Sequence, residues 1–337
     1  LNVGFELSLF EKVKLQADYF REKRSGIFLQ RSGLPIIVGI STIPYINVGE
    51  TLNQGIDANL EYSQKISNVF VTARGNFTYN RNKMINNDDP DWEYKYQNRI
   101  GKPFGSYGSV QPFGLKALGL FASQEEIDNS PKQTYGEYRV GDIRYQDING
   151  DGVIDSQDEV ALGYTNMPEI VYGFGATAQW KNWDFNVFFQ GVAHTSFFLA
   201  GASLRSPFSS GSMERSAVNE DIYGNVWMST NTPEQNDRAI YPRLSLSNQA
   251  GSSNNNQTSD WWLRDGSFLR LKNFEIGYTL PKKLLGKNFI RSLRFYVAAN
   301  NLLTFCNFKL WDPEKGSSDG SGYPLNRVVT LGFNINL

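Results

Sequence analysis

The last nine residues of the chain alternate strictly between apolar and polar side chains, which limits the folds that the chain can adopt. The apolar members are Val329, Leu331, Phe333, Ile335 and Leu337. Because successive side chains of a β-strand point to opposite faces, the pattern predicts a strand with one apolar and one polar face. In a soluble β-sandwich the apolar face would lie in the core, whereas in a transmembrane barrel it would meet lipid. This strand alone leaves both folds open.

The same alternation recurs along the chain in pairs of segments that are joined by short turns. The predicted strands cover residues 2–9, 13–19, 56–62, 69–79, 172–180, 183–189, 268–280, 293–304 and 329–337. Each pair is typical of an antiparallel hairpin, so the sequence predicts nine strands. The alternation slips within 268–280, which indicates either a β-bulge near Asn273 or a charged rim that contains Arg270 and Lys272.

The connections between these strands alternate between short turns and long polar loops. The long loops cover roughly residues 25–48, 82–168, 193–267 and 305–327. Outer-membrane barrels sort their connections in this way, with the long loops outside the cell. We therefore expect an all-β fold, an antiparallel transmembrane β-barrel, with long extracellular loops. Because such barrels have an even number of strands, and because the chain starts at Leu1 without a signal peptide, we expect residues 1–337 to be the C-terminal part of a larger barrel.

Composition agrees with membrane-spanning strands and argues against other classes. The chain has 33 basic and 34 acidic residues, a formal net charge of -1, so no field attracts nucleic acid. The mean hydropathy is -0.42, and no apolar run of about 18 residues predicts a spanning helix. Spanning strands need only about 10 residues with every second one apolar. Aromatic residues near strand ends indicate girdles at the membrane interfaces: Tyr19, Tyr79, Trp180, Trp183, Tyr278 and Phe305.

An acidic segment in the second long loop has the spacing of a calcium-binding loop. Oxygen ligands would come from six positions, with Gly152 at the sharp turn: Asp147, Asn149, Asp151, Val153, Asp155 and Asp158. Asp158 replaces the usual glutamate at the last position, and no helical pattern flanks the loop. The alternative is a turn that its own Asx hydrogen bonds hold without metal. Ca²⁺ is the one cofactor that the sequence suggests.

Signatures of catalysis are absent from the sequence, so we expect no enzyme. There is no G-x-S-x-G, P-loop or H-E-x-x-H motif, and the single Cys306 and single His194 exclude zinc sites built on several such residues. We interpret His194 as a residue at a loop base with ordinary hydrogen bonds. Four tryptophans in the loops either stack on sugar or peptide cargo or anchor their own loops: Trp92, Trp227, Trp261 and Trp262.

Several segments together resemble the SusC/RagA group of TonB-dependent outer-membrane transporters, over nearly the whole chain. These segments are Asn47–Gly49, Asn53–Asp57, Gly101–Gly108, Gly114–Pro131, Gly141–Ile154, Tyr241–Leu244, Phe268–Pro281 and Asn300–Glu314. The resemblance implies a barrel of about 22 strands around an N-terminal plug. The plug and the TonB box would lie outside this chain. The family ends in an aromatic residue, whereas this chain ends in Leu337, with Phe333 nearby.

The resemblance also implies TonB-energised import of oligosaccharides or peptides across a Gram-negative outer membrane, under a SusD-like surface lipoprotein that acts as a lid. Polar residues on the inner face would meet water and cargo: Arg74, Asp184, Asn186 and Gln190. One alternative is a secreted calcium-dependent carbohydrate-binding β-protein, whose strands would turn their apolar faces inward. Another is a glycosidase with two carboxylates from distant loops across a cleft.

Overall fold

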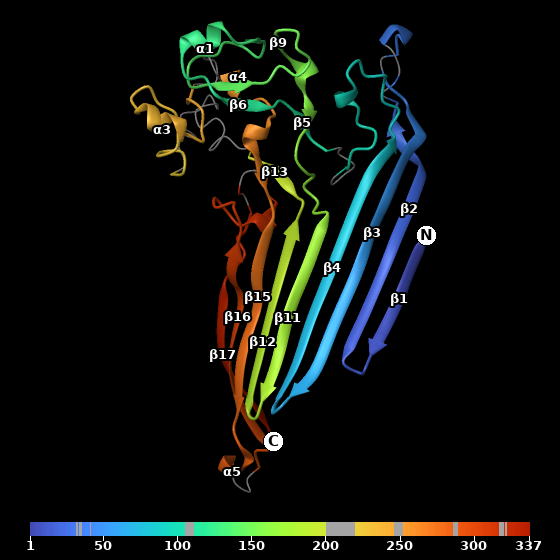
Figure 1. Ribbon diagram of the computed structural model, residues 1–337, viewed down its shortest axis with the longest axis vertical. Helices are drawn as coiled ribbons and strands as arrows, with labels where there is room; N and C mark the ends of the chain where they lie inside the picture. The colour runs from blue at the N-terminus through green and yellow to red at the C-terminus, as the bar shows by residue number, and fades with distance from the viewer. Residues whose placement is uncertain are drawn as a thin grey trace.

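One antiparallel sheet of nine strands is the main body of the protein (Figure 1). The computed structural model describes residues 1–31, 33, 36–40, 42–104, 111–199, 220–245, 252–285, 289–316, 320 and 322–337. The strand order is β1-β2-β3-β4-β11-β12-β15-β16-β17, so each long strand pairs with the next long strand along the chain. The bounds are β1 Asn2–Leu9, β2 Val13–Gln30, β3 Tyr45–Ile66, β4 Val69–Asn86, β11 Ile170–Trp180, β12 Trp183–Ala193, β15 Phe268–Thr279, β16 Ser292–Phe305 and β17 Val328–Asn336. All nine predicted strands are present.

The connections are sorted by length between the two ends of the sheet, as predicted. Two-residue turns follow β3 and β11, and their first residues, Ser67 and Lys181, have φ angles of 55° and 53°. Left-handed residues at this place give a hairpin turn whose twist matches that of the strands. The fourth connection at this end contains the short helix α5, Lys282–Leu285. All the long connections leave from the opposite end (Figure 1).

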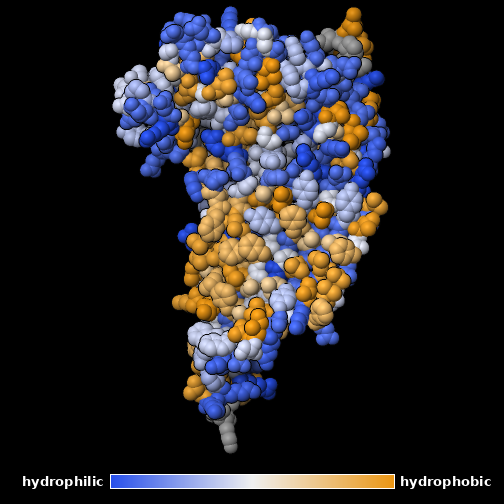
Figure 2. All heavy atoms as spheres, viewed as in Figure 1, coloured by the Kyte–Doolittle hydropathy of each residue, from blue (hydrophilic) through white to orange (hydrophobic). Residues whose placement is uncertain are grey.

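The two faces of the sheet differ in polarity, and the apolar face is uncovered. In β17, Leu331, Phe333 and Ile335 are 80%, 63% and 48% exposed. They continue apolar rows of the neighbouring strands, for example the row that runs from Leu331 through Val297 and Ile276. Figure 2 shows hydrophobic residues gathered over the middle of the strands, with mostly polar residues above and below. No second sheet packs on this apolar band within the described residues, so the apolar face is not the inside of a sandwich.

Aromatic side chains lie at both edges of the apolar band. Trp180, Trp183 and Tyr278 are register neighbours near the turn end, and the rings of Trp183 and Tyr278 are 4.7 Å apart. Tyr19 and Tyr79 flank Ile56 toward the other end of the sheet. This placement is the one expected for residues at two membrane interfaces.

A β-bulge in β15 explains the slip in the alternation of this strand. The register jumps from Leu271 to Asn273 on both sides of the strand, so Lys272 has no partner in the ladder. The extra residue shifts the alternation by one position. Even-numbered residues before it, such as Arg270, therefore lie on the polar face, whereas even-numbered residues after it, such as Phe274, lie on the apolar face. Of the two interpretations that the sequence left open, the structure shows the bulge.

The first long loop is shorter than predicted. We expected a loop at residues 25–48, but β2 continues to Gln30 and β3 starts at Tyr45. The strands remain paired through a charged stretch, with Arg21 opposite Gln54 and Arg24 opposite Thr51. The charged residues of this stretch predicted a loop. The two strands nevertheless stay paired here, because each strand satisfies the backbone hydrogen bonds of the other whatever the polarity of the side chains.

The other long connections fold together into a lobe at one end of the sheet (Figure 1). Its elements are short: η2 Lys95–Gln97, β5 Phe113–Gly114, β6 Ala117–Leu120, α1 Gln124–Asp128, β7 Lys132–Gln133, β8 Ile143–Tyr145, β9 Val153–Ile154, η4 Ser156–Asp158, β10 Val160–Ala161, β13 Ser196–Phe198, α3 Pro233–Asp237, α4 Ser252–Asn255, η6 Asp260–Trp262, β14 Leu263–Asp265 and η7 Pro313–Lys315. The 3-10 helix η1, Ile36–Val38, lies in the first connection. Of the family-like segment Gly101–Gly108, the last four residues lie outside the described part of the chain.

The lobe contains a hydrophobic core of its own. Residues from three connections, those between β4 and β11, between β12 and β15 and between β16 and β17, meet there: Leu115, Ile143, Tyr145, Ile154, Phe197, Leu199, Ile222, Val226, Tyr241, Trp262 and Phe308. The loops were predicted only as polar segments, and their irregularly spaced apolar residues gave no sign of this core. None of the described helices is long and apolar enough to span a bilayer.

Candidate functional site

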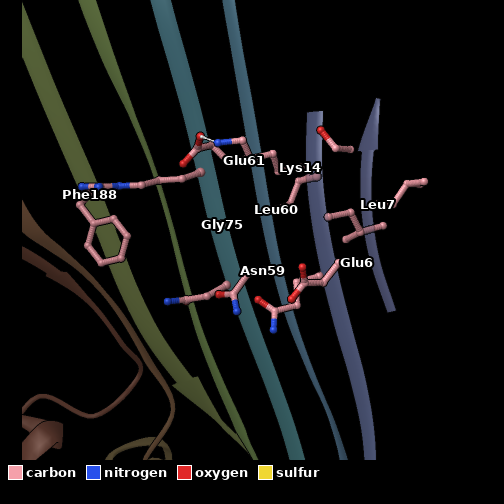
Figure 3. Close-up of a pocket in the computed structure, with 13 residues that line it drawn as sticks. Glu6, Leu7, Lys14, Asn59, Leu60, Glu61, Gly75 and Phe188 are labelled. Atoms are coloured by element: carbon pink, nitrogen blue, oxygen red, sulfur yellow. Dashed lines mark ion pairs between the residues drawn. The ribbon is translucent and has the colours of Figure 1, made fainter. Parts of the chain in front are cut away.

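The polar face of the sheet forms a hollow wall, which is the first candidate functional surface (Figure 3). A cavity of about 650 Å³ extends over it from β1 to Phe188 of β12, so this face is the concave one. Two rows of side chains cross it in register. One row is Glu6, Gln16, Asn59 and Asn76, and the other is Ser8, Lys14, Glu61 and Arg74.

The side chains of these rows include positively charged donors, negatively charged acceptors and neutral amides. Lys14 Nζ lies 3.7 Å from a carboxylate oxygen of Glu61, and the guanidinium of Arg74 lies 5.5 Å from the ring centre of Phe188. One row offers a carboxylate and three amides, and the other offers a hydroxyl, an ammonium, a carboxylate and a guanidinium, and all of these groups can bind the hydroxyl groups of a sugar or the backbone of a peptide. The alternation of the sequence correctly placed Arg74 on this face, together with three residues of β12: Asp184, Asn186 and Gln190.

A charged triad lies on the same face nearer the turn end. Arg294 of β16 donates from Nε to Asp184 Oδ1 over 2.9 Å and from Nη2 to Glu275 Oε1 over 2.5 Å, and it also contacts Asp184 Oδ2 through Nη2. Its guanidinium lies over Gly277, where a Cβ would overlap it. The sequence identified Asp184. It missed Glu275, because the bulge hides which face each residue of β15 occupies, and it missed Arg294 of β16, because its partner Asp184 is 110 residues away.

The junction between sheet and lobe holds the one histidine. His194 Nδ1 lies 3.2 Å from Glu169 Oε2, and Arg81 Nε lies 3.5 Å from the other oxygen of this carboxylate. The ring of Tyr164 stacks on His194 with centroids 4.5 Å apart. These are the ordinary hydrogen bonds that the sequence predicted for His194, and they tie β4 to the connection before β11 and to the connection after β12.

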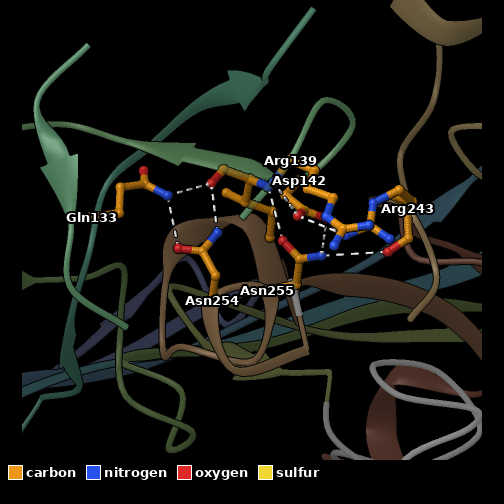
Figure 4. A network of polar contacts seen from close by, with 7 residues as sticks. Gln133, Arg139, Asp142, Arg243, Asn254 and Asn255 are labelled. Carbon is orange, nitrogen blue, oxygen red and sulfur yellow. Dashed lines mark hydrogen bonds and ion pairs between the residues drawn. The ribbon is translucent and has the colours of Figure 1, made fainter. Parts of the chain in front are cut away.

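A buried polar network fixes the lobe (Figure 4). Asp142 is fully buried and accepts hydrogen bonds from Arg243 Nη2, Asn255 Nδ2 and the backbone N–H of Arg139, all over 2.8–2.9 Å. Beside it, the side chains of Gln133 and Asn254 both donate to the carbonyl of Ile143. This network joins segments that are more than a hundred residues apart in the sequence.

Two tyrosines, the buried Tyr241 and the partly buried Tyr135, belong to the same lobe. Burial raises the pKa of the Tyr241 hydroxyl, which donates to Asp221 Oδ2 over 2.7 Å. Burial and the nearby carboxylates of Glu159, Asp155 and Asp158 also raise the pKa of Tyr135. Both hydroxyls therefore stay protonated at neutral pH, where they act as neutral structural groups.

The acidic loop Asp147–Asp158 is held by hydrogen bonds to its own backbone. Asp147 accepts from the N–H groups of Gly150 and Gly152, and Asp151 accepts from that of Val153. The fully buried Asp158 accepts from Ile148 and Asp155. In the described part of the chain no three acidic, histidine or cysteine side chains converge as a metal site would require. This geometry fits the Asx turn, and calcium binding stays a prediction.

The four predicted cargo-binding tryptophans do not form one site. Trp262 is fully buried in the core of the lobe, where Nε1 donates to the carbonyl of Asn255. Trp261 packs against the same core, and the ring of Trp227 covers Gly141. Trp92 is half-buried and lines a separate cavity of about 390 Å³. Cargo contact stays a prediction, and the placement favours it for Trp92 alone.

Comparisons with known proteins agree with the resemblance. No family model matches the chain. The chain is 29% identical, over 99% of its length, to the TonB-dependent receptor P26 of Formosa agariphila, of which it covers 34%. It is 22% identical over 94% of its length to the TonB-dependent receptor SusC of Bacteroides thetaiotaomicron, of which it covers 29%. The chain thus spans about a third of the length of the curated relatives that it matches.

The fold is that of a solved transporter barrel. The RagAB peptide importer in its open-open state superposes with a TM-score of 0.68 at 23% identity, over the whole of this chain and 34% of that one. The closed-closed state gives the same score over 99% of this chain and 35% of that one. The chain is thus similar along nearly its whole length to TonB-dependent receptors, SusC among them, and its nine strands have the fold of a portion of the barrel wall in the RagAB structures.

Proposed function

We propose that the chain forms part of the wall and the extracellular mouth of an outer-membrane importer of oligosaccharides or peptides. One observation carries the proposal: the sheet has an uncovered apolar face and a concave polar face. A sheet with this arrangement can separate lipid from a water-filled lumen, because each strand between β1 and β17 is hydrogen-bonded to a neighbour on both sides. The names of the relatives, and the description of the RagAB protein as a peptide importer, support the same function.

The proposed mechanism divides the work between this chain and partners outside it. The polar rows of the wall would hold cargo by exchangeable hydrogen bonds, and the lobe would shape the entrance. A SusD-like lipoprotein would close over the lobe. Energy would come from TonB acting on a plug inside the barrel, so the wall itself would stay rigid. The proposal includes no chemical reaction on the cargo, and turnover of a glycan or peptide by the purified protein would contradict it.

The test is uptake by living cells. Cells that carry the full-length gene should accumulate a fluorescently labelled oligosaccharide or peptide, and deletion of the gene or of tonB should abolish the accumulation. The protein should be found in the detergent-soluble outer-membrane fraction, where a co-purifying lipoprotein would identify the lid. Recovery of a folded monomer from the aqueous phase without detergent would overturn the proposal. That outcome would favour the secreted carbohydrate-binding protein, against which the exposed apolar band now argues.

A further inference from the structure

The cavity beside Trp92 lies in the lobe, away from the polar wall. It is formed by the segment after β4 and by the end of the acidic loop, with a volume of about 390 Å³. Two aromatic rings line it, Trp92 and Phe113, together with Arg99 and three carboxylates. The carboxylates are Asp91, Glu93 and Glu159. The volume is within the range of pockets for small ligands, which run from roughly 300 to 1,000 Å³.

Hydrogen bonds hold the two walls of this cavity together. Tyr96 donates its hydroxyl to the carbonyl of Gln157 over 2.6 Å, and Gln97 Nε2 donates to the carbonyl of Ser156 over 2.9 Å. The turn Ser156–Asp158 is itself fixed by a capping box between Asp155 and Asp158. The acidic loop therefore has a structural use that needs no metal, since it presents one wall of a preformed pocket. A preformed pocket loses little entropy when a ligand binds.

The charges of the cavity are unbalanced. Within the described residues, none of the three carboxylates makes a hydrogen bond or an ion pair. Arg99 lies over the rings, with its guanidinium 5.6 Å from the centre of Trp92 and 5.9 Å from that of Phe113, and its charge also attracts the carboxylate of Glu159. Three carboxylates against one guanidinium give the lining a formal charge of −2, with Asp91 and Glu93 exposed at the rim and Glu159 partly buried, where burial raises its pKa. A lining of this charge concentrates cations, and aromatic faces add to their binding.

We propose that this cavity is a subsite for a cationic side chain, lysine or arginine, of a peptide cargo. The proposal rests on the function proposed above and specifies the cargo as a basic peptide. The unpaired carboxylates decide between cargo classes, because a neutral sugar would leave their charge unbalanced whereas an ammonium or guanidinium group would neutralise it.

The test compares two peptides that differ only in charge. Full-length protein, purified with any lipoprotein partner, is titrated with a fluorescent lysine-containing peptide and with the same peptide after acetylation of its lysines. We expect the acetylated peptide to bind about tenfold more weakly at low salt, and this difference to shrink at high salt. The double variant Glu93→Gln/Glu159→Gln should bind both peptides about equally. The control Glu137→Gln changes an exposed carboxylate elsewhere in the lobe and should bind like the parent.

Equal binding of the two peptides by the parent protein would overturn the proposal, and this comparison needs no variant to fold. Displacement of the lysine peptide by a neutral oligosaccharide or an amino sugar at equal concentration would also overturn it. Uptake separates this inference from the proposed function. If tonB-dependent uptake of peptide persists while charge has no effect on binding, only the subsite is wrong. If charge controls binding but no cargo is imported, the importer is wrong.

Discussion

Arg294 is the cation that pairs with both Asp184 and Glu275 on the polar face of the sheet. Its side chain is 22% exposed, and its partners Asp184 and Glu275 are 33% and 35% exposed, so solvent screens the triad only in part. An Arg294→Gln substitution would leave two adjacent carboxylates without their cation. We expect the unfolding free energy to fall by about 1–3 kcal/mol. Heat-dependent gel mobility of the full-length protein in detergent would measure the change.

The control for Arg294 is an ion pair of the same face that is open to water. Lys14 and Glu61 are 70% and 47% exposed, and a Lys14→Gln substitution should change the unfolding free energy by less than about 0.5 kcal/mol. If the two substitutions lowered the unfolding free energy equally, burial would not be the reason for the contribution of Arg294.

In the lobe, the buried carboxylate of Asp142 stabilises the fold through its bonds to Arg243 and Asn255. An Asp142→Ala substitution removes a fully buried carboxylate from Arg243 and Asn255, which should cost about 3–5 kcal/mol. Because the network lies in the lobe alone, we expect faster hydrogen exchange there and unchanged exchange in the sheet. The exposed Glu137→Ala serves as the control. Uniform loss of protection over sheet and lobe would contradict the local role of this network.

Among the elements, β15 depends most on one residue. Deletion of Lys272 removes the extra residue opposite β12, so every residue on one side of the deletion changes face, and Arg270 would move toward the apolar band. We expect the deletion to abolish folding in the outer membrane, as judged by loss of the heat-modifiable band. Lys272→Ser keeps the bulge and loses only a partly exposed ion pair with Glu314 of 3.3 Å, so it should fold. A stable deletion variant would mean that the register can slip without cost.

The acidic loop gives a prediction about metal. Since its carboxylates accept hydrogen bonds from backbone N–H groups, we expect calcium or chelator to change the thermal midpoint of the lobe by no more than about 1 °C. Calorimetric titration of the full-length protein with CaCl₂ checks this, with Asp151→Asn as the variant. Tight binding that the variant loses would establish the calcium site that the spacing suggested.

Local pattern explains which elements could be predicted from the sequence. The strands follow from alternation because each one repeats the rule within about ten residues, and the same rule placed Arg74, Asp184, Asn186 and Gln190 on the polar face. The core of the lobe depends on contacts such as Tyr145 Oη with the carbonyl of Asn254, 109 residues away. The local alternation of apolar and polar residues carries no information about a contact between residues so far apart in the sequence. The cavity beside Trp92 was missed for the same reason, since its walls come from separate segments.

At the scale of the whole molecule, the decisive property is the environment of the apolar band. Leu331 is 80% exposed at the middle of β17, and Thr330 beside it lies on the polar face. If the band met water, a Leu331→Lys substitution would be close to neutral, because an exposed leucine contributes little to folding. In a bilayer, a lysine near the midplane costs about 2–4 kcal/mol, whereas one facing the lumen costs far less. We therefore expect Leu331→Lys to lower the unfolding free energy in lipid vesicles by that amount and Thr330→Lys to leave it within about 1 kcal/mol of the parent. Equal stability of both variants would mean that water or another protein, and not lipid, covers this face.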